Sequence, residues 1–319
     1  MPEWTYERGI GESRAALIGG DRILEARVLL DGTLPFGSVV ECRLRSVGDN
    51  GRNAIAVAGD ELEVLLPTRP SGVSEGAELL VEITREAIPG AEPWKRPSGR
   101  VTDAVSSASG IKGRPLPFPP VGSDLLERAG WSDLLDEARS GIVGFAGGEL
   151  KLYVTPAMTL IDVDGTLSPT DLAIAGAAAA GSAIRRLGIG GSIGIDLPTT
   201  AGKEARRRAA EALDEALGET PFERTAVNGF GFVQVVRPRR HASLLELAGD
   251  RAAFEARALL RRAAVAGHGP CRLAVHPLVA AILQSKPDWL LALAGQRGGT
   301  VALRADPALA ISAGHAEPL

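Results

Sequence analysis

The chain lacks the features that mark disulfide-rich, zinc-bound or membrane-embedded proteins. Its 319 residues include two cysteines, Cys42 and Cys271, which are too few for a disulfide framework and too far apart for a paired-cysteine zinc motif. No run approaches the ~20 apolar residues of a spanning helix, and residues 1–17 have no apolar core behind a basic start. These absences predict a cytoplasmic protein with no membrane-spanning segment.

A strong charge of either sign is also missing. The formal net charge is −4, which gives no electrostatic reason for the whole surface to attract nucleic acid. Basic residues do gather locally, because Arg237, Arg239 and Arg240 follow a stretch from Thr225 without any acidic residue. Nucleic acid is therefore expected to bind locally if it binds. The four histidines show no metal-ligand spacing.

Apolar residues, glycine and proline are plentiful, and with the length they predict about two to four compact units. The patterns of strands and helices predict a mixed α+β class. Residues 1–34 alternate around Gly19-Gly20-Asp21, as expected of a β-hairpin. Four or five short strands between residues 37 and 103 predict a small barrel such as an OB-fold. Residues 104–122 are rich in Ser, Gly and Pro and are expected to connect two units.

The second half of the chain alternates strands and helices. Residues 124–139 favour a helix, or a pair of helices broken at Gly130. From residue 149 the pattern predicts an α/β layer, with an Ala-rich helix between two strands. The last eighty residues repeat the alternation on a smaller scale, including a helix over residues 244–266, and predict a separate small domain.

The candidate chemical residues are aspartates at strand ends. Asp162 and Asp164 are two residues apart at the end of an apolar strand, so both side chains lie on one face. Asp196 ends the next predicted strand, and a right-handed crossover would bring it to the same sheet edge. Such a cluster suits Mg²⁺. The alternative is that Asp164-Gly165 is an ordinary turn and Asp196 caps a turn before Pro198.

The six residues from Asp162 to Leu167 resemble the nucleophile motif of haloacid-dehalogenase-like phosphatases. In that family the first Asp is phosphorylated and the second acts as acid and base. The family also needs a downstream Lys and an acidic pair after a later strand. After Asp196 the chain offers only Gly249-Asp250 on a predicted helix, so this interpretation is the weaker one.

A longer stretch resembles the RNase E/G endoribonucleases. Residues 147–164 are similar to the family segment that runs from a Gly-Gly strand to "E-A-L-T-x-I-D-V-N", and residues 190–197 are similar to "G-G-x-I-x-I-D-F". Three further segments match in order: residues 183–187 resemble "I-A-R-Q-L", residues 203–209 the Arg-rich helix, and residues 229–235 "R-F-G-L-L-E-M". The spacing agrees over about 90 residues.

The resemblance implies an architecture. Residues 1–34 and 111–140 would form a split RNase H-like segment, and residues 35–105 an inserted OB-fold RNA-binding domain. Residues 141–238 would be the DNase I-like catalytic domain, and residues 239–319 a small C-terminal α/β domain. Similarity is weakest in the amino-terminal half.

The resemblance also implies an activity. Asp162 and Asp196 would hold one Mg²⁺ that activates water and cleaves single-stranded RNA, leaving a 5′-phosphate and a 3′-hydroxyl, in RNA processing or decay. Asp164 would be the third catalytic residue, at a position where the family usually has Asn. Its extra charge strengthens metal binding or repels the phosphate.

Several positions depart from the family pattern. Gly229 replaces an Arg, so a phosphate contact would have to come from Arg224, Arg237 or Arg239. In the barrel, the stacking Phe positions read as Ile55 or Ala56 and as Val64 or Leu65, which predicts weaker RNA binding. The basic residues expected near the last barrel strands are Arg85 and Lys95.

Two family features are missing from the sequence. The stretch between barrel and catalytic domain is too short for a 5′-monophosphate sensor, and no paired-cysteine link follows Pro238. We therefore expect no 5′-end sensing and no zinc-linked tetramer, while a homodimer through other surfaces stays open. The remaining alternatives to the nuclease are the phosphatase and a catalytically weakened RNA-binding relative.

Overall fold

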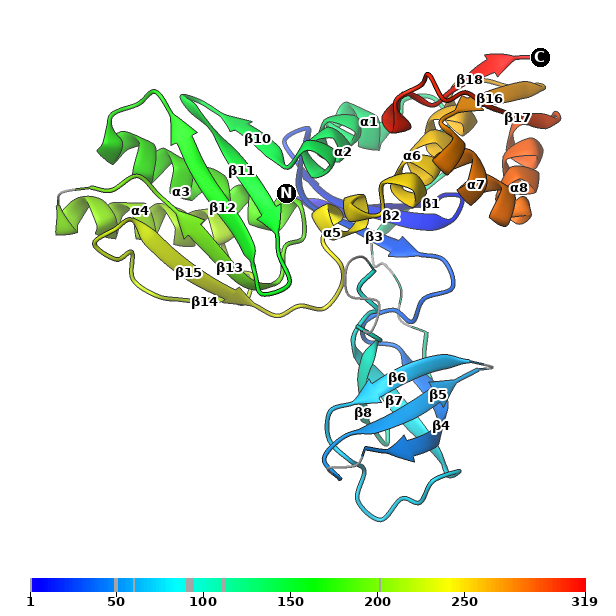
Figure 1. Ribbon diagram of the computed structural model, residues 1–319, viewed down its shortest axis with the longest axis horizontal. Helices are drawn as coiled ribbons and strands as arrows, with labels where there is room; N and C mark the ends of the chain where they lie inside the picture. Colours follow the sequence, from blue (N-terminus) through cyan, green and yellow to red (C-terminus); the bar gives the residue numbers. More distant parts are fainter. Residues whose placement is uncertain are drawn as a thin grey trace. The chain divides into compact units, whose positions relative to one another are not determined.

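The computed structural model describes residues 2–48, 51–59, 61–89, 95–108, 110, 113–200 and 202–319 (Figure 1). Its contacts divide the chain into two compact units. The first comprises Met1–Asp31, Ile111–Asp133 and Leu247–Leu319, and the second comprises Gly32–Gly110 and Leu134–Glu246. Helices and several sheets occur in both units, which confirms the α+β class. None of the described helices is long and apolar enough to cross a membrane.

The first unit contains a four-stranded sheet built from both sides of the barrel insertion. Its strands are β1 (Glu3–Arg8), β2 (Glu12–Gly19), β3 (Arg22–Leu30) and β9 (Arg114–Leu116), in the order β3-β2-β1-β9. The expected hairpin is β2–β3, and its turn residues Gly20 and Asp21 have φ of 57° and 59°, as tight hairpin turns require. Strand β1 precedes the hairpin and was not predicted. Strand β9 lies in the expected connector, whose residues 109, 111 and 112 are outside the described part.

The predicted barrel is present in the second unit. Strands β4 (Val39–Val47), β5 (Ala54–Ala58), β6 (Leu62–Leu66), β7 (Glu78–Arg85) and β8 (Ser98–Val101) close into a barrel in the order β4-β5-β6-β8-β7. Alternate residues of each strand point inward, and the interior holds Cys42, Leu44, Ala56, Val64, Leu66, Val81 and Ile83. Apolar burial on a period of two therefore explains both the strands and their closure.

Cys42 gives a test of this core. Burial raises the pKa of the Cys42 thiol to about 11, so at pH 8 it should carry at least about 100-fold less thiolate than an exposed cysteine of pKa about 8.5. Cys271 is fully buried as well. Ellman's reagent should therefore react with neither thiol in native buffer and with both in urea. Rapid reaction of one native thiol would contradict the closed core.

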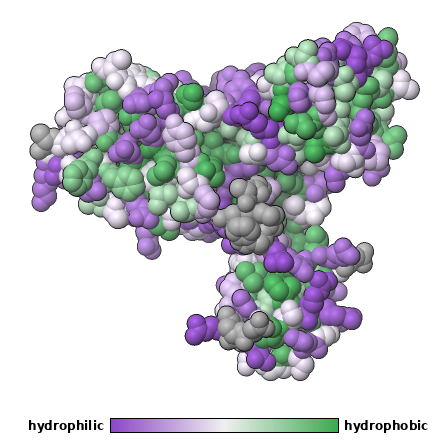
Figure 2. Space-filling model, viewed as in Figure 1, coloured by the Kyte–Doolittle hydropathy of each residue, from purple (hydrophilic) through white to green (hydrophobic). Residues whose placement is uncertain are grey.

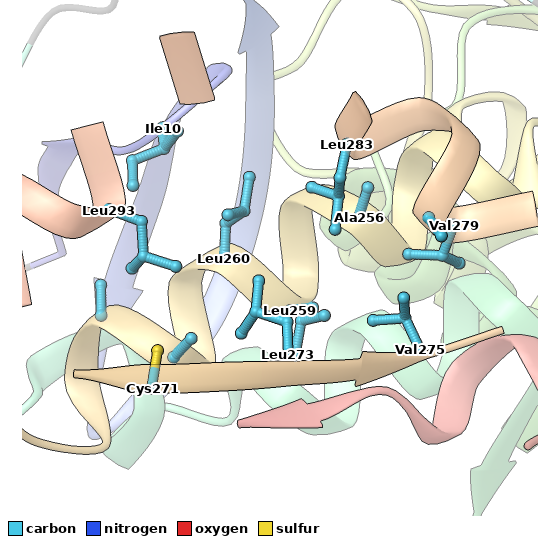
Figure 3. Packing of buried hydrophobic residues seen from close by; sticks show 13 residues of the cluster. Ile10, Ala256, Leu259, Leu260, Cys271, Leu273, Val275, Val279, Leu283 and Leu293 are labelled. Carbon is cyan, nitrogen blue, oxygen red and sulfur yellow. The ribbon is translucent and has the colours of Figure 1, made fainter. Parts of the chain in front are cut away.

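The carboxy-terminal elements complete the first unit. Helices α6 (Arg251–Val265), α7 (Pro277–Ser285) and α8 (Pro287–Arg297) pack with strands β16 (Cys271–Val275), β17 (Val301–Ala305) and β18 (His315–Pro318). In Figure 3, apolar side chains of α6, α7, α8 and β16 meet in one cluster, which also includes Ile10 from the amino-terminal segment. Residues 247–319 thus share a core with Ile10, which lies between β1 and β2, and form one unit with the first strands. This grouping differs from the expected separate domain over 239–319.

Two helix breaks have local causes. The expected pair α1 (Leu125–Arg128) and α2 (Trp131–Ser140) is broken at Gly130, whose φ is 94°, a conformation that favours glycine. The helix expected over 244–266 is divided into α5 (Leu244–Gly249) and α6 because Asp250 caps α6 and accepts a hydrogen bond from the Ala253 amide.

A buried ionic cluster lies between the first sheet and α6. Glu7, Glu12, Arg14, Arg257 and Arg261 are each at most 7% exposed. Arg14 Nη1 donates to Glu7 Oε1 (2.9 Å), and Arg257 Nε donates to Glu12 Oε2 (2.7 Å). Because buried charges need partners, these five side chains fix α6 against β1 and β2.

The second unit also contains the predicted α/β layer. Its strands are β10 (Ile142–Phe145), β11 (Gly148–Val154), β12 (Thr159–Gly165), β13 (Gly191–Asp196), β14 (Glu223–Arg224) and β15 (Phe232–Arg237), in the order β10-β11-β12-β13-β15-β14. Helices α3 (Pro169–Arg186) and α4 (Lys203–Leu217) cover one face (Figure 1). Glycines allow the close packing, because a Cβ at Gly176 would meet Val163 of β12 and one at Gly181 would meet Ala216 of α4.

Candidate functional site

Asp162 and Asp196 are direct cross-strand partners. Strand β12 pairs with β13 in parallel, joined by α3, and the register places Asp162 opposite Asp196. Neighbouring strands lie about 4.8 Å apart, so the two carboxylates are side by side. Ile161 and Val163 of β12 are buried toward the helices, so Asp162 belongs to the opposite, open face of the sheet. The predicted parallel pairing of these two strands is confirmed.

A single row of polar and aromatic residues crosses four strands at this level. The register aligns Lys151 of β11 with Asp162, Asp162 with Asp196, and Asp196 with Phe232 of β15. Because partners in register share a face, a cation, two carboxylates and an aromatic ring stand side by side on the open face. Asp162 is half-buried and Asp196 is exposed, so both remain accessible to a solute.

Asp164 lies on the same face, one step further along β12. Lys151 Nζ donates to Asp164 Oδ2 at 2.6 Å and lies 3.5 Å from Glu149 Oε1. The hydrogen bond and charge of Asp164, supplemented by Glu149, raise the pKa of Lys151. Lys151 is therefore a permanent cation here, and it balances the carboxylate of Asp164.

Two of the arginines expected to bind RNA face the helices. Arg224 is bound through Nε and Nη2 to both carboxylate oxygens of Asp214 on α4, at 2.5 Å each. Arg237 Nη1 donates to the carbonyl oxygens of Ile184 (3.3 Å) and Ile189 (2.8 Å). Both guanidinium groups hold the sheet against α3 and α4, on the face opposite the aspartate pair.

The remaining predicted basic residues also have partners. Arg239 forms an ion pair with Glu246, and Arg85 Nη2 donates to the carbonyl of Arg96 at 2.9 Å. Burial, with the nearby charge of Arg239, lowers the pKa of Arg85. Lys95 is half-buried and also interacts with another group of the protein. None of these five residues is brought into the row that contains Asp162 and Asp196.

The barrel positions considered for base stacking lie on two sides of the barrel wall. Ala56 and Val64 point into the core, whereas Ile55 and Leu65 are half-buried and face outward as direct cross-strand partners. The outward pair occupying the expected stacking positions is thus aliphatic. Aliphatic side chains lack the flat π-surface on which bases stack.

The donor set at the aspartate pair fits Mg²⁺. This ion usually takes one or two carboxylates and completes its octahedron with waters and substrate phosphate oxygens, which Asp162 and Asp196 on an open face permit. In the described part of the chain, no group of three or more His, Cys, Asp and Glu side chains is arranged around a metal-sized point. The expected metal cluster of all three aspartates is therefore not formed: Asp164 is bound to Lys151, and only the pair Asp162 and Asp196 is left as candidate ligands.

The acidic residue considered for a phosphatase lies elsewhere. Asp250 belongs to the other compact unit, and its carboxylate caps α6 by accepting from the Ala253 amide at 3.2 Å. Its N-cap role accounts for Asp250.

Sequence reasoning missed Lys151 and Phe232. The signal for both was strand alternation: Glu149 and Lys151 alternate with buried Leu150 and Leu152, and Phe232 alternates with buried Val233. The sequence does not give the register of the partner strands, so neither residue could be placed beside the aspartates.

No family model and no curated protein matches the chain.

Proposed function

We propose that the chain is a Mg²⁺-dependent endoribonuclease of the RNase E/G type that cleaves single-stranded RNA. The observation that carries the proposal is the register that pairs Asp162 with Asp196 on an open sheet face. The barrel supports it, since its strand order and its insertion between β3 and β9 suit an inserted OB-fold. The RNase H-like and DNase I-like assignments of the flanking sheets belong to the same proposal.

Asp162 and Asp196 would hold the metal ion, which when bound polarises the phosphate and activates a water. The protein residues supply position and charge. The open face admits a strand of RNA, and the two carboxylates fix where its phosphate docks. Lys151 reduces the local negative charge of Glu149 and Asp164, which would otherwise repel the phosphate. A duplex is less suited to this face because its bases are stacked inside the double helix and are turned away from the sheet.

Cleavage of an A/U-rich single-stranded RNA tests the proposal. The purified chain should cut it with Mg²⁺, stop on addition of EDTA, and leave products that a 5′-phosphate-dependent exonuclease degrades. RNA with a 5′-hydroxyl should be cut as fast as RNA with a 5′-monophosphate. Retention of intact RNA on a filter without cleavage would favour the RNA-binding relative. Hydrolysis of small phosphate esters would favour the phosphatase.

Removing the Lys151 charge should weaken RNA binding. Lys151→Met leaves Glu149 and Asp164 unbalanced near the phosphate, and one unit charge at about 4 Å in water amounts to about 1 kcal/mol. We expect the KM for RNA to rise about 5-fold in low salt and less in 0.5 M salt, where screening is stronger.

The compensating change makes this prediction specific. Lys151→Met combined with Asp164→Asn restores the local charge and should bring KM back toward that of the unmodified chain. Lys286→Met, at an exposed position of the other unit, should leave KM unchanged. Failure of the double variant to recover would show that Lys151 acts through something other than charge balance.

A further inference from the structure

Two aromatic residues, one paired with Asp196 and one in the loop that precedes β15, have no role in the metal site. The first is Phe232, the cross-strand partner of Asp196. A Cβ on Gly194 would come within 2.7 Å of Phe232 Cζ and 3.0 Å of Leu160 Cδ2. The absence of a side chain at Gly194 therefore allows the Phe232 ring and Leu160 to approach each other across β13. They form an apolar surface directly adjoining the row of Asp162 and Asp196.

The second is Phe230, which is 83% exposed. Its backbone is nevertheless well fixed: the Phe230 amide donates to Asn228 Oδ1 (2.9 Å), and Thr199 Oγ1 donates to the Phe230 carbonyl (3.1 Å). Gly231 has a φ of 94°, and a Cβ there would lie 2.1 Å from the Leu197 carbonyl oxygen. The loop is thus held against the segment that follows Asp196, with its aromatic ring in solvent.

Such exposure suggests a ligand with a flat apolar face. Packing does not explain Phe230, because almost all of its surface is in water, and a fixed backbone reduces the entropy lost when a ligand orders the loop. The sheet face has further exposed apolar residues in Leu160 and Tyr153, and hydrophobic patches adjoin hydrophilic ones on the side seen in Figure 2. Phosphate-binding chemistry and aromatic surface next to each other match a nucleotide, which combines a charged phosphate with a flat base.

We propose that Phe230 and the Phe232–Leu160 surface receive unpaired bases of the nucleotides that flank the phosphate held at Asp162 and Asp196. The inference rests on the proposed nuclease function and adds where the bases of the substrate bind. It also accounts for the aliphatic pair Ile55 and Leu65 on the barrel: the stacking that the barrel lacks is supplied at the cleavage site. Recognition of this kind requires single strands and tolerates different base sequences.

The test uses a short single-stranded RNA in which 2-aminopurine replaces one base at a time, mixed with the full chain and Mg²⁺. Stacking on an aromatic ring quenches 2-aminopurine, so quenching should peak at one or two positions next to the cleaved bond. Phe230→Ala, which removes an exposed side chain, should abolish the quenching at one position and lower kcat/KM about 5- to 150-fold, the range of stacking on one aromatic residue. Phe232→Leu, which keeps an apolar side chain over Gly194, should do the same at the neighbouring position.

An abasic substrate links each ring to a base. When the base at the quenched position is missing, the wild-type chain should be slowed as much as the Phe variant, and the variant should lose nothing more. Leu291→Ala, which removes a side chain 70% exposed on α8, should change neither signal nor rate.

The outcomes separate the two proposals. Quenching that depends on Phe230 and Phe232 in a chain that cuts no RNA would retain the base-binding surface and reject the nuclease. If the chain cleaves RNA but the Phe variants are as fast as wild type, the base-binding surface is rejected and the nuclease is retained. The same holds if the losses from the variant and from the abasic substrate multiply. A change of sedimentation coefficient in Phe230→Ala, with unaltered quenching, would assign the surface to self-association and overturn the inference.

Discussion

Asp162→Asn and Asp196→Asn should each lower the rate of RNA cleavage by about 10³-fold or more. Either change removes one negative charge from the pair that would hold Mg²⁺, and a loss of about 4 kcal/mol in transition-state stabilisation corresponds to that factor. Single-turnover cleavage at saturating RNA measures the loss directly. The side chains differ little in size, and both sites are at least partly open to solvent, so the fold should be retained.

The metal dependence makes the prediction sharper. If both aspartates are ligands, each variant should need a higher Mg²⁺ concentration for its residual activity, and the double variant should be little worse than either single one because the residues act as a unit. Glu223→Gln is the matched control. Glu223 is an exposed acid on edge strand β14, opposite Val236 and not Asp196, and its neutralisation should leave the rate unchanged.

The result that would contradict the site is also clear. A rate that falls with Asp162→Asn but not with Asp196→Asn would remove the reason for reading the pair as one metal site. If that pattern came with hydrolysis of small phosphate esters, Asp162 would act as a nucleophile, as the hexapeptide from Asp162 to Leu167 first suggested. The same two variants thus separate the alternatives that the sequence left open.

Local patterns predicted the elements around the aspartates because those elements depend on local physics. The apolar alternation before Asp162, the Ala-rich helix and the short strand before Asp196 were each visible in one segment. Chirality of the crossover then placed the strand ends together, and the pairing of Asp162 with Asp196 follows. The barrel was predictable for the same reason, since turn residues separate its short strands.

The interactions that were missed depend on register or on distant segments. Lys151 reaches Asp164 only because β11 pairs with β12 in one particular alignment, and a shift of one residue would turn it to the other face. Arg224 and Arg237 looked available in the sequence, yet both guanidinium groups are bound on the helix side. The sequence alone does not show which of its basic residues hold the fold together.

Arg261→Ala should destabilise the first unit by about 3 to 5 kcal/mol, the usual cost of removing one partner from a buried ion pair. Arg261 is 4% exposed on α6. Its Nε donates to Glu7 Oε1 at 2.8 Å, and its Nη2 donates to Asp124 at 2.9 Å. Burial lowers the pKa of Arg261, but Glu7 and Asp124 outweigh that effect and raise it overall, so the group stays charged in the folded chain.

Urea unfolding followed by tryptophan fluorescence measures this loss, because Trp4, Trp131 and Trp289 all belong to the first unit. Arg251→Ala is the control: Arg251 is exposed at the start of the same helix, and its loss should shift stability by no more than about 0.5 kcal/mol. An Arg261→Ala midpoint equal to that of the control would show that the cluster does not hold α6.

The partner of Arg261 supplies the decisive comparison. Glu7→Gln alone should also be costly, because Arg261 and Arg14 both bind Glu7 and would be left with a neutral partner in a buried site. Combining Glu7→Gln with Arg261→Ala should cost less than the sum of the two, since the second change no longer breaks an intact pair. Additive losses would mean that the two residues stabilise the unit independently. A coupled loss would show that α6 is attached to the amino-terminal sheet through this ion pair, whose two residues are 254 positions apart in the sequence.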